Sequence, residues 1–147
     1  MTARVRLAVL GDPLRYTRSP DLHRAGAAAL GLDCESHAVR TPLAALGETL
    51  ARLAAEGYTG CNLTMPLKEA ALACVRETTP TARRARSINT VTFLAAGSSG
   101  DTTDGVGFVE LLAALDRDAR RARIVLLGAG GAARSLALAA RSSTKPT

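Results

Sequence analysis

The sequence contains no tryptophan, two tyrosines and two phenylalanines among 147 residues, and its three cysteines show neither metal-ligand nor CxxC spacing. An odd number of cysteines without such spacing indicates reduced thiols in a reducing compartment rather than a disulfide framework. All apolar runs fall short of the ~18 residues that a membrane span needs, and the first residues lead into a turn without a signal-peptide cleavage site. These absences predict a cytoplasmic protein with no membrane partner.

A concentrated basic strip of the kind that binds nucleic acid is also missing. The net charge is +6, but the arginines are scattered along the chain and few aromatic residues are available to stack on bases. The positive charge is therefore interpreted as a solvated surface that favours anionic substrates, and no nucleic acid partner is expected. An apolar fraction of 47% and a charged fraction of 22% are typical of a globular protein. The length is that of one domain, or of one domain and the start of another.

Lysine is scarce in this chain. Of the 19 cationic side chains, two are lysine (Lys68 and Lys145) and the remaining 17 are arginine. Arginine does not release its proton in a protein, whereas a partly buried lysine can. Lys68 is therefore a candidate for proton transfer, and the alternative is a solvated lysine at the start of a helix.

Lys68 follows a short apolar stretch in which a strand signal and a helix signal meet. Residues 61–63 are expected to end a buried strand, because Pro66 has no N–H for the ladder and suits the first turn of a helix. Asn62, Thr64 and Lys68 would then lie together at the carboxyl end of a strand. Open α/β sheets bind their ligands at that end, so this stretch is the first candidate site.

The rest of the pattern predicts an α/β fold: a mostly parallel open sheet flanked by helices, followed by a truncated Rossmann-type unit. Strands are expected at 4–10, 34–39 and 87–94, helices at 19–30, after 42 and from 105, and a turn at 95–100. Ser19 is a natural N-cap, which leaves Thr17 without a role unless the two hydroxyls hold a carboxylate. Asp104 is also interpreted as an N-cap. His23 and His37 have no metal spacing and are interpreted as incidental.

A glycine-rich segment near the carboxyl end indicates a nucleotide site. Residues 124–127 are expected to form an apolar strand, and Gly128-x-Gly130-x-x-Ala133 then opens an alanine-rich helix, which fits the dinucleotide-binding fingerprint. The residue that reads the cofactor ribose lies ~20 positions beyond the first glycine, past Thr147. The chain is therefore expected to hold an amino-terminal domain over 1–104. Residues 105–147 would then supply a linking helix and the first strand, loop and helix of a truncated NAD(P)-binding domain.

Five separated blocks, in this order along the chain, resemble shikimate dehydrogenase. They are residues 11–14 (GDPL) with 17–23 (TRSPDLH), 60–69 (GCNLTMPLKE), 87–90 (SINT), 103–107 (TDGVG) and 128–132 (GAGGA). Members of this family reduce 3-dehydroshikimate to shikimate with NADPH on the route to aromatic amino acids. The resemblance implies the same activity, with residues 1–104 as the substrate-binding catalytic domain and the chain itself as a fragment of the enzyme. NADP is the expected cofactor and NAD the alternative.

The resemblance also implies a role for each matching position. Thr17 and Ser19 would bind the substrate carboxylate, with threonine in place of the family's first serine. The residues implied to contact the ring hydroxyls and the carboxylate are Asn62, Thr64, Lys68, Asn89 and Asp104. Lys68 would be the catalytic lysine and Asp104 its partner. The cofactor would lie against Gly128, Ala129, Gly130, Gly131 and Ala132. Two departures are Thr102, where the family usually has asparagine, and Leu63, where it usually has valine.

Two other functions fit the same motifs. Quinate or aminoshikimate dehydrogenases share them, and the residues that would separate NADP from NAD lie beyond the sequence. A non-catalytic domain that binds shikimate-like acids is the second alternative. In each case the partner is a small molecule, and the sequence leaves the oligomeric state, including a homodimer, open.

Overall fold

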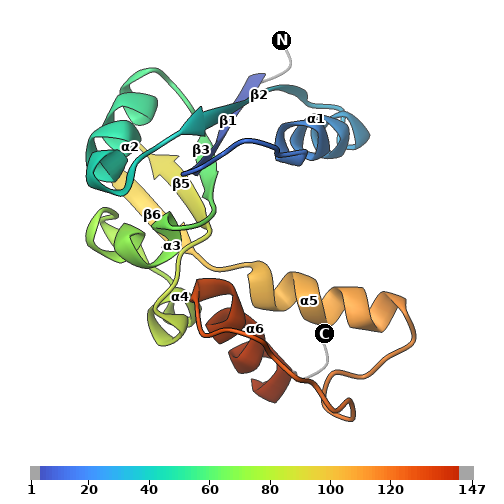
Figure 1. Cartoon of the computed structure of the whole chain (residues 1–147). Coiled ribbons are helices and arrows are strands. Elements are labelled where there is room, and N and C mark those ends of the chain that lie inside the picture. The colour runs from blue at the N-terminus through green and yellow to red at the C-terminus, as the bar shows by residue number, and fades with distance from the viewer. Residues whose placement is uncertain (1–3, 143–147) are drawn as a thin grey trace.

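The structure, a computed structural model, describes residues 4–142, and a six-stranded sheet lies at its centre (Figure 1). The strands are β1 (Arg4–Gly11), β2 (Asp33–Arg40), β3 (Gly60–Leu63), β4 (Glu77–Thr78), β5 (Thr90–Leu94) and β6 (Gly97–Asp101). Their order is β2-β1-β3-β5-β6-β4. β1 is parallel to both β2 and β3, β5 is antiparallel to both β3 and β6, and β4 is parallel to β6. The predicted mostly parallel sheet is confirmed.

The helices are α1 (Ser19–Ala29), α2 (Leu46–Ala55), α3 (Leu67–Ala70), α4 (Pro80–Ala85), α5 (Asp104–Ala114) and α6 (Gly131–Ser142). Two short 3₁₀ helices, η1 (Leu43–Ala45) and η2 (Ala71–Ala73), precede α2 and follow α3. Figure 1 shows α1 beside β1 and β2, α2 on the opposite side of the sheet, and α5 and α6 packed together beyond the sheet's lower end. None of these helices, within residues 4–142, is long and apolar enough to cross a membrane.

The hydrophobic core lies between the sheet and α2. Leu46, Leu50 and Leu53 occupy one face of α2 at helical spacing, and each is at most 4% exposed. They pack with Leu10 of β1 and Cys61 of β3 in a single buried cluster. Burial raises the pKa of the Cys61 thiol to about 12, so it behaves as a small apolar side chain. This core fixes the carboxyl ends of β1 and β3, from which the site residues extend.

Two predictions about local structure are wrong. The turn expected over 95–100 is mostly strand β6, which pairs with β5 through a short connection at residues 95–96. The strand expected over 124–127 does not form: no described strand lies beside it to complete a ladder, and Val125 and Leu127 are 84% and 95% exposed. An apolar run needs hydrogen-bonding neighbours as well as hydrophobicity to become a strand.

Candidate active site

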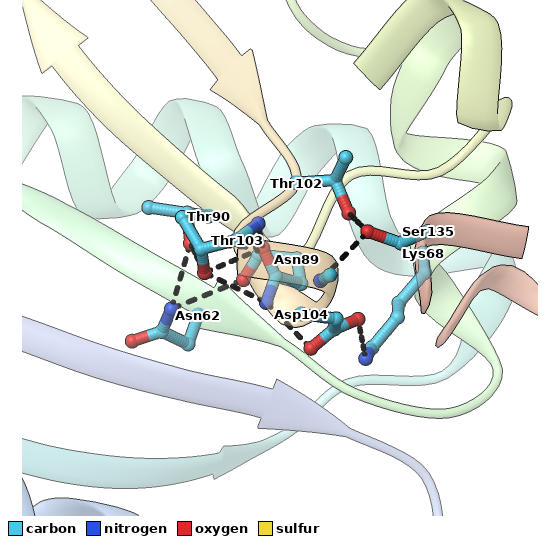
Figure 2. Close-up of polar contacts among 9 residues, drawn as sticks. Asn62, Lys68, Asn89, Thr90, Thr102, Thr103, Asp104 and Ser135 are labelled. Atoms are coloured by element: carbon cyan, nitrogen blue, oxygen red, sulfur yellow. Dashed lines mark hydrogen bonds and ion pairs between the residues drawn. The ribbon is translucent and has the colours of Figure 1, made fainter. Parts of the chain in front are cut away.

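An ion pair between Lys68 and Asp104 lies at the centre of the site (Figure 2). Leu67, which is fully buried, anchors α3 in the core, and Lys68 follows it directly. Asp104 is the first residue of α5, where the positive end of the helix dipole favours an acidic side chain. Lys68 Nζ donates to Asp104 Oδ2 at 2.6 Å, and the two side chains are only 18% and 20% exposed. The interpretation of Asp104 as an N-cap is wrong, because Thr103 occupies the cap position and the Asp104 carboxylate faces the lysine.

Asn89 holds the second oxygen of Asp104. The backbone N–H of Thr103 donates to Asn89 Oδ1 at 2.9 Å, and a backbone N–H only donates, so the amide oxygen must face it. The Asn89 NH₂ group is thereby directed at Asp104 Oδ1, at 2.8 Å. Each carboxylate oxygen of Asp104 thus has its own donor, one from Asn89 and one from Lys68, which fixes the plane of the carboxylate.

Asn62 extends this network along β3. Its Nδ2 donates to the backbone carbonyl of Asn89 and to Thr90 Oγ1, both at 3.1 Å. Its amide oxygen therefore points away from the cluster, as Figure 2 shows. Thr64 lies between β3 and α3, four residues before Lys68. Its backbone N–H donates to the carbonyl of Leu10, and Thr64 lines the same cavity as Lys68. Asp104 thus contacts the lysine directly, and Asn89 and then Asn62 continue the hydrogen-bond network away from it.

Thr17 and Ser19 lie at the start of α1, the helix that packs against β1 and β2. Ser19 is the first helical residue and its side chain forms no cap, so the prediction of Ser19 as N-cap is wrong. Thr17, for which the sequence suggested no structural role, instead accepts a hydrogen bond at its Oγ1 from the Ser19 backbone N–H at 3.2 Å. Among residues 4–142 no hydrogen bond joins either hydroxyl to the Lys68 cluster. They occupy the corner formed by the amino end of α1.

His23, interpreted from sequence as incidental, connects that corner to the rest of the site. Its Nδ1 lies 2.8 Å from Ser36 Oγ on β2. Burial lowers the pKa of His23, a hydrogen bond with the Asn62 side chain opposes that shift, and the charge of Arg24 adds to it. Ser36 and Asn62 are both far from His23 in the sequence, so no local motif indicated that His23 would lie beside them.

A cavity of about 500 Å³ joins Lys68 to the glycine turn. Its lining includes Thr64, Lys68, Gly128 and residues 130–133, whereas Ala129 lies outside it. Gly128 has a φ of +112°, which favours glycine, and a Cβ at Gly130 would meet no atom within 4 Å, so the backbone is open to a ligand there. The first turn of α6 faces this cavity. The glycine turn and the start of α6 thus fit a pyrophosphate group, although strand 124–127 is not formed.

Two further contacts around the cavity were not predicted. Arg134 on α6 forms an ion pair with Glu69 on α3 at 2.6 Å, and this guanidinium holds the pKa of the Glu69 carboxyl below its usual range. Ser135, the next residue on α6, accepts a hydrogen bond from Thr102 at 3.0 Å. Thr102 is the residue that stands in place of the family's asparagine. Single residues inside an alanine-rich helix carried no pattern that could have identified either contact.

The fold and the site define an α/β domain in which a lysine paired with an aspartate lines the same cavity as a dinucleotide-type glycine turn. Residues 9–91 match the family model described as the shikimate dehydrogenase substrate binding domain. The chain belongs to this family.

Known relatives extend the comparison beyond the family match. The chain is 42% identical over 131 residues to shikimate dehydrogenase (NADP(+)) of Gluconobacter oxydans, a match that covers 89% of this chain and 47% of the relative. It is 40% identical, with a TM-score of 0.86, to shikimate 5-dehydrogenase from Thermus thermophilus in complex with NADP(H) and shikimate, covering 93% of this chain and 52% of that one.

A more distant neighbour carries a different name. Ligand-free 5-ketofructose reductase of Gluconobacter sp. strain CHM43 is 26% identical with a TM-score of 0.82, covering 94% of this chain and 50% of that one. The chain thus spans about half the length of the relatives it matches.

Proposed function

We propose that this chain is the substrate-binding half of an NADPH-dependent shikimate dehydrogenase, which reduces 3-dehydroshikimate to shikimate on the route to aromatic amino acids. The observation that carries the proposal is the Lys68–Asp104 pair at 2.6 Å, whose lysine lines the same cavity as the glycine turn. Relatives at about 40% identity that are named shikimate dehydrogenase (NADP(+)) support it. The same proposal places the protein in the cytoplasm, with small molecules and no nucleic acid as its partners.

Substrate recognition in this proposal divides between the two corners of the site. The hydroxyls of Thr17 and Ser19, at the amino end of α1, would bind the carboxylate of shikimate. The amides of Asn62 and Asn89, with Thr64, would bond the ring hydroxyls, each of which both donates and accepts. A site built to bond hydroxyls discriminates strongly against analogues that lack them, because its buried polar groups would be left unpaired.

Lys68 would act as the acid of the reaction. The nicotinamide cofactor, when bound, supplies the hydride that reaches the carbonyl carbon. Lys68, as an ammonium, lies where it can stabilise the negative charge that develops on the carbonyl oxygen and donate a proton to it, and can accept that proton in the reverse direction. Asp104 and Asn89 hold the amine in place. Residues 128 and 130–132, with Ala129 in the same turn, would hold the cofactor's phosphates against the start of α6.

Separate titrations of the chain with shikimate and with NADPH test the proposal. We expect calorimetry to detect shikimate binding that is lost or weakened at least tenfold in Asn62→Ala and Asn89→Ala, because each change leaves ring hydroxyls unpaired. Quinate serves as the competing acid, and 5-ketofructose, which has no carboxylate, tests the function suggested by the ketose reductase neighbour. A folded chain that binds neither shikimate nor 3-dehydroshikimate contradicts the proposal. Tighter binding of quinate or 5-ketofructose assigns the site to that substrate, and shikimate binding without NADPH binding limits this chain to the acid-binding role.

A further inference from the structure

The hydroxyl of Ser135 on α6 is hydrogen-bonded to a residue on each side of Asp104. Ser135 is 1% exposed, and its Oγ accepts from Thr102 Oγ1 and from the backbone N–H of Gly105, each at 3.0 Å. Thr102 is itself 2% exposed. Figure 2 shows this pair beside the Lys68–Asp104 contact. Residues 102 and 105 lie on either side of Asp104, so Ser135 fixes the backbone from which the carboxylate extends.

The first turn of α5 has no room to move relative to α6. A Cβ added at Gly105 would collide with the backbone carbonyl of Ser135 and would lie 2.8 Å from the Cβ of Ala139. The two helices therefore touch through their backbones at this point. Close-packed elements of this kind transmit displacements directly, because few voids are available to absorb them.

We propose that Ser135 is a positioning residue: through Thr102 and Gly105 it fixes Asp104, and Asp104 in turn orients the Lys68 amine. Gly131, which lines the cavity, lies one helical turn before Ser135 on α6. The helix that begins at the glycine turn therefore also fixes, through Ser135, the carboxylate that orients the proton donor. This inference rests on the proposed function, because it concerns the same lysine. The competing explanation is that Thr102 and Ser135 satisfy each other's hydroxyls in a buried place and affect stability alone.

The scarcity of lysine allows a direct test without any ligand. The chain contains two lysines, Lys68 and Lys145, so lysine-specific ¹³C labelling yields two Cε signals, and Lys68→Ala identifies the one from Lys68. We expect the Lys68 signal to move in Ser135→Ala and in Thr102→Val. It should stay at the wild-type position in Thr102→Ser, which retains the hydroxyl.

Thr41→Val is the matched control for lost stability. Thr41 is fully buried and its hydroxyl donates to the backbone carbonyl of Val39 at 3.1 Å, so this change removes a comparable buried hydrogen bond within the β2–η1 connection. The control should leave the Lys68 signal in place while lowering the unfolding midpoint about as much as Thr102→Val does. If Ser135→Ala does not fold, Thr102→Val decides the outcome, because it retains Ser135 and the bond to Gly105.

Shikimate affinity provides the second readout. We expect it to fall about threefold to tenfold in Ser135→Ala and Thr102→Val, the effect of one hydrogen bond, and to be unchanged in Thr102→Ser and Thr41→Val. An unmoved Lys68 signal in both folded variants, or an equal movement in Thr41→Val, would overturn the positioning role. A wild-type chain that binds no shikimate contradicts the proposed function instead, and the ligand-free Lys68 signal still decides whether Ser135 positions the amine.

Discussion

Lys68 differs chemically from almost every other cation of this chain. The remaining cationic residues, apart from Lys145, are arginines, whose guanidinium groups keep their protons in proteins. Lys68 is also enclosed: its side chain is 18% exposed and its amine faces Asp104. An amine that is partly withdrawn from water and held by a carboxylate is suited to give a proton to a substrate oxygen and take it back. A solvated lysine at a helix start, the alternative from sequence, is inconsistent with this burial.

Two substitutions at Lys68 distinguish the contribution of its positive charge from that of its transferable proton. In an enzyme that carries this domain with a complete nucleotide-binding domain, we expect Lys68→Ala to lower kcat by about 100-fold or more, the usual contribution of a positioned acid. KM should change much less, because substrate contacts made by Asn62 and Asn89 remain. Lys68→Arg is the control: it keeps the positive charge, so KM should stay near the wild-type value while kcat remains low. Steady-state kinetics in which KM alone changes would remove Lys68 from the acid role.

At the scale of elements, sequence reasoning worked where a single segment contains its own signal. The helix expected after residue 42 forms as α2, and Leu46, Leu50 and Leu53 recur at helical spacing on its buried face. These features depend on short-range periodicity and on local hydrogen bonding, which a sequence displays directly.

Sequence reasoning failed where the outcome depends on a partner elsewhere in the chain. Asp104 has the chemistry of an N-cap, but Lys68, 36 residues away, takes its carboxylate. Residues 124–127 are as apolar as a strand and remain unpaired because the described chain places no strand next to them. The Thr102–Ser135 bond joins residues 33 apart and leaves no local pattern. Long-range pairing of this kind follows from the fold and not from the segment.

The buried face of α2 makes a stability prediction at this scale. Leu53 is 1% exposed within the core cluster, and we expect Leu53→Ala to lower the unfolding free energy by about 2–5 kcal/mol, the sum of lost transfer and the cavity that remains. Leu43, on the neighbouring η1, is 52% exposed, so Leu43→Ala should change it by less than about 0.5 kcal/mol. Urea unfolding followed by circular dichroism measures both. Equal losses in the two variants would contradict the assignment of α2's inner face.

At the scale of the whole molecule, the proposed site draws on segments spread along the described chain. It combines hydroxyls at the start of α1, amides of β3 and of the residue before β5, the amine of α3, the carboxylate of α5 and the glycine turn before α6. Such a site exists only when the complete fold is present. His23 links α1 to the sheet, since its Nδ1 lies 2.8 Å from Ser36 Oγ on β2 and the Asn62 side chain on β3 influences its pKa.

His23 therefore couples the stability of the whole fold to pH. Burial chiefly holds the pKa of His23 in the folded chain below its ordinary value of 6.5, so near and below that pH the unfolded chain binds more protons than the folded one. The unfolding free energy should accordingly decrease as pH falls from about 7.5 to 5.5, a window above the titration of ordinary carboxylates. We expect the unfolding free energy of His23→Gln to fall less over this pH range than that of the wild type. His37→Gln removes the other histidine, and its unfolding free energy should fall as much as that of the wild type. Urea unfolding at each pH provides the measurement. A wild-type slope that survives in His23→Gln and disappears in His37→Gln would show that the buried α1 histidine is not the group through which acid destabilises the fold.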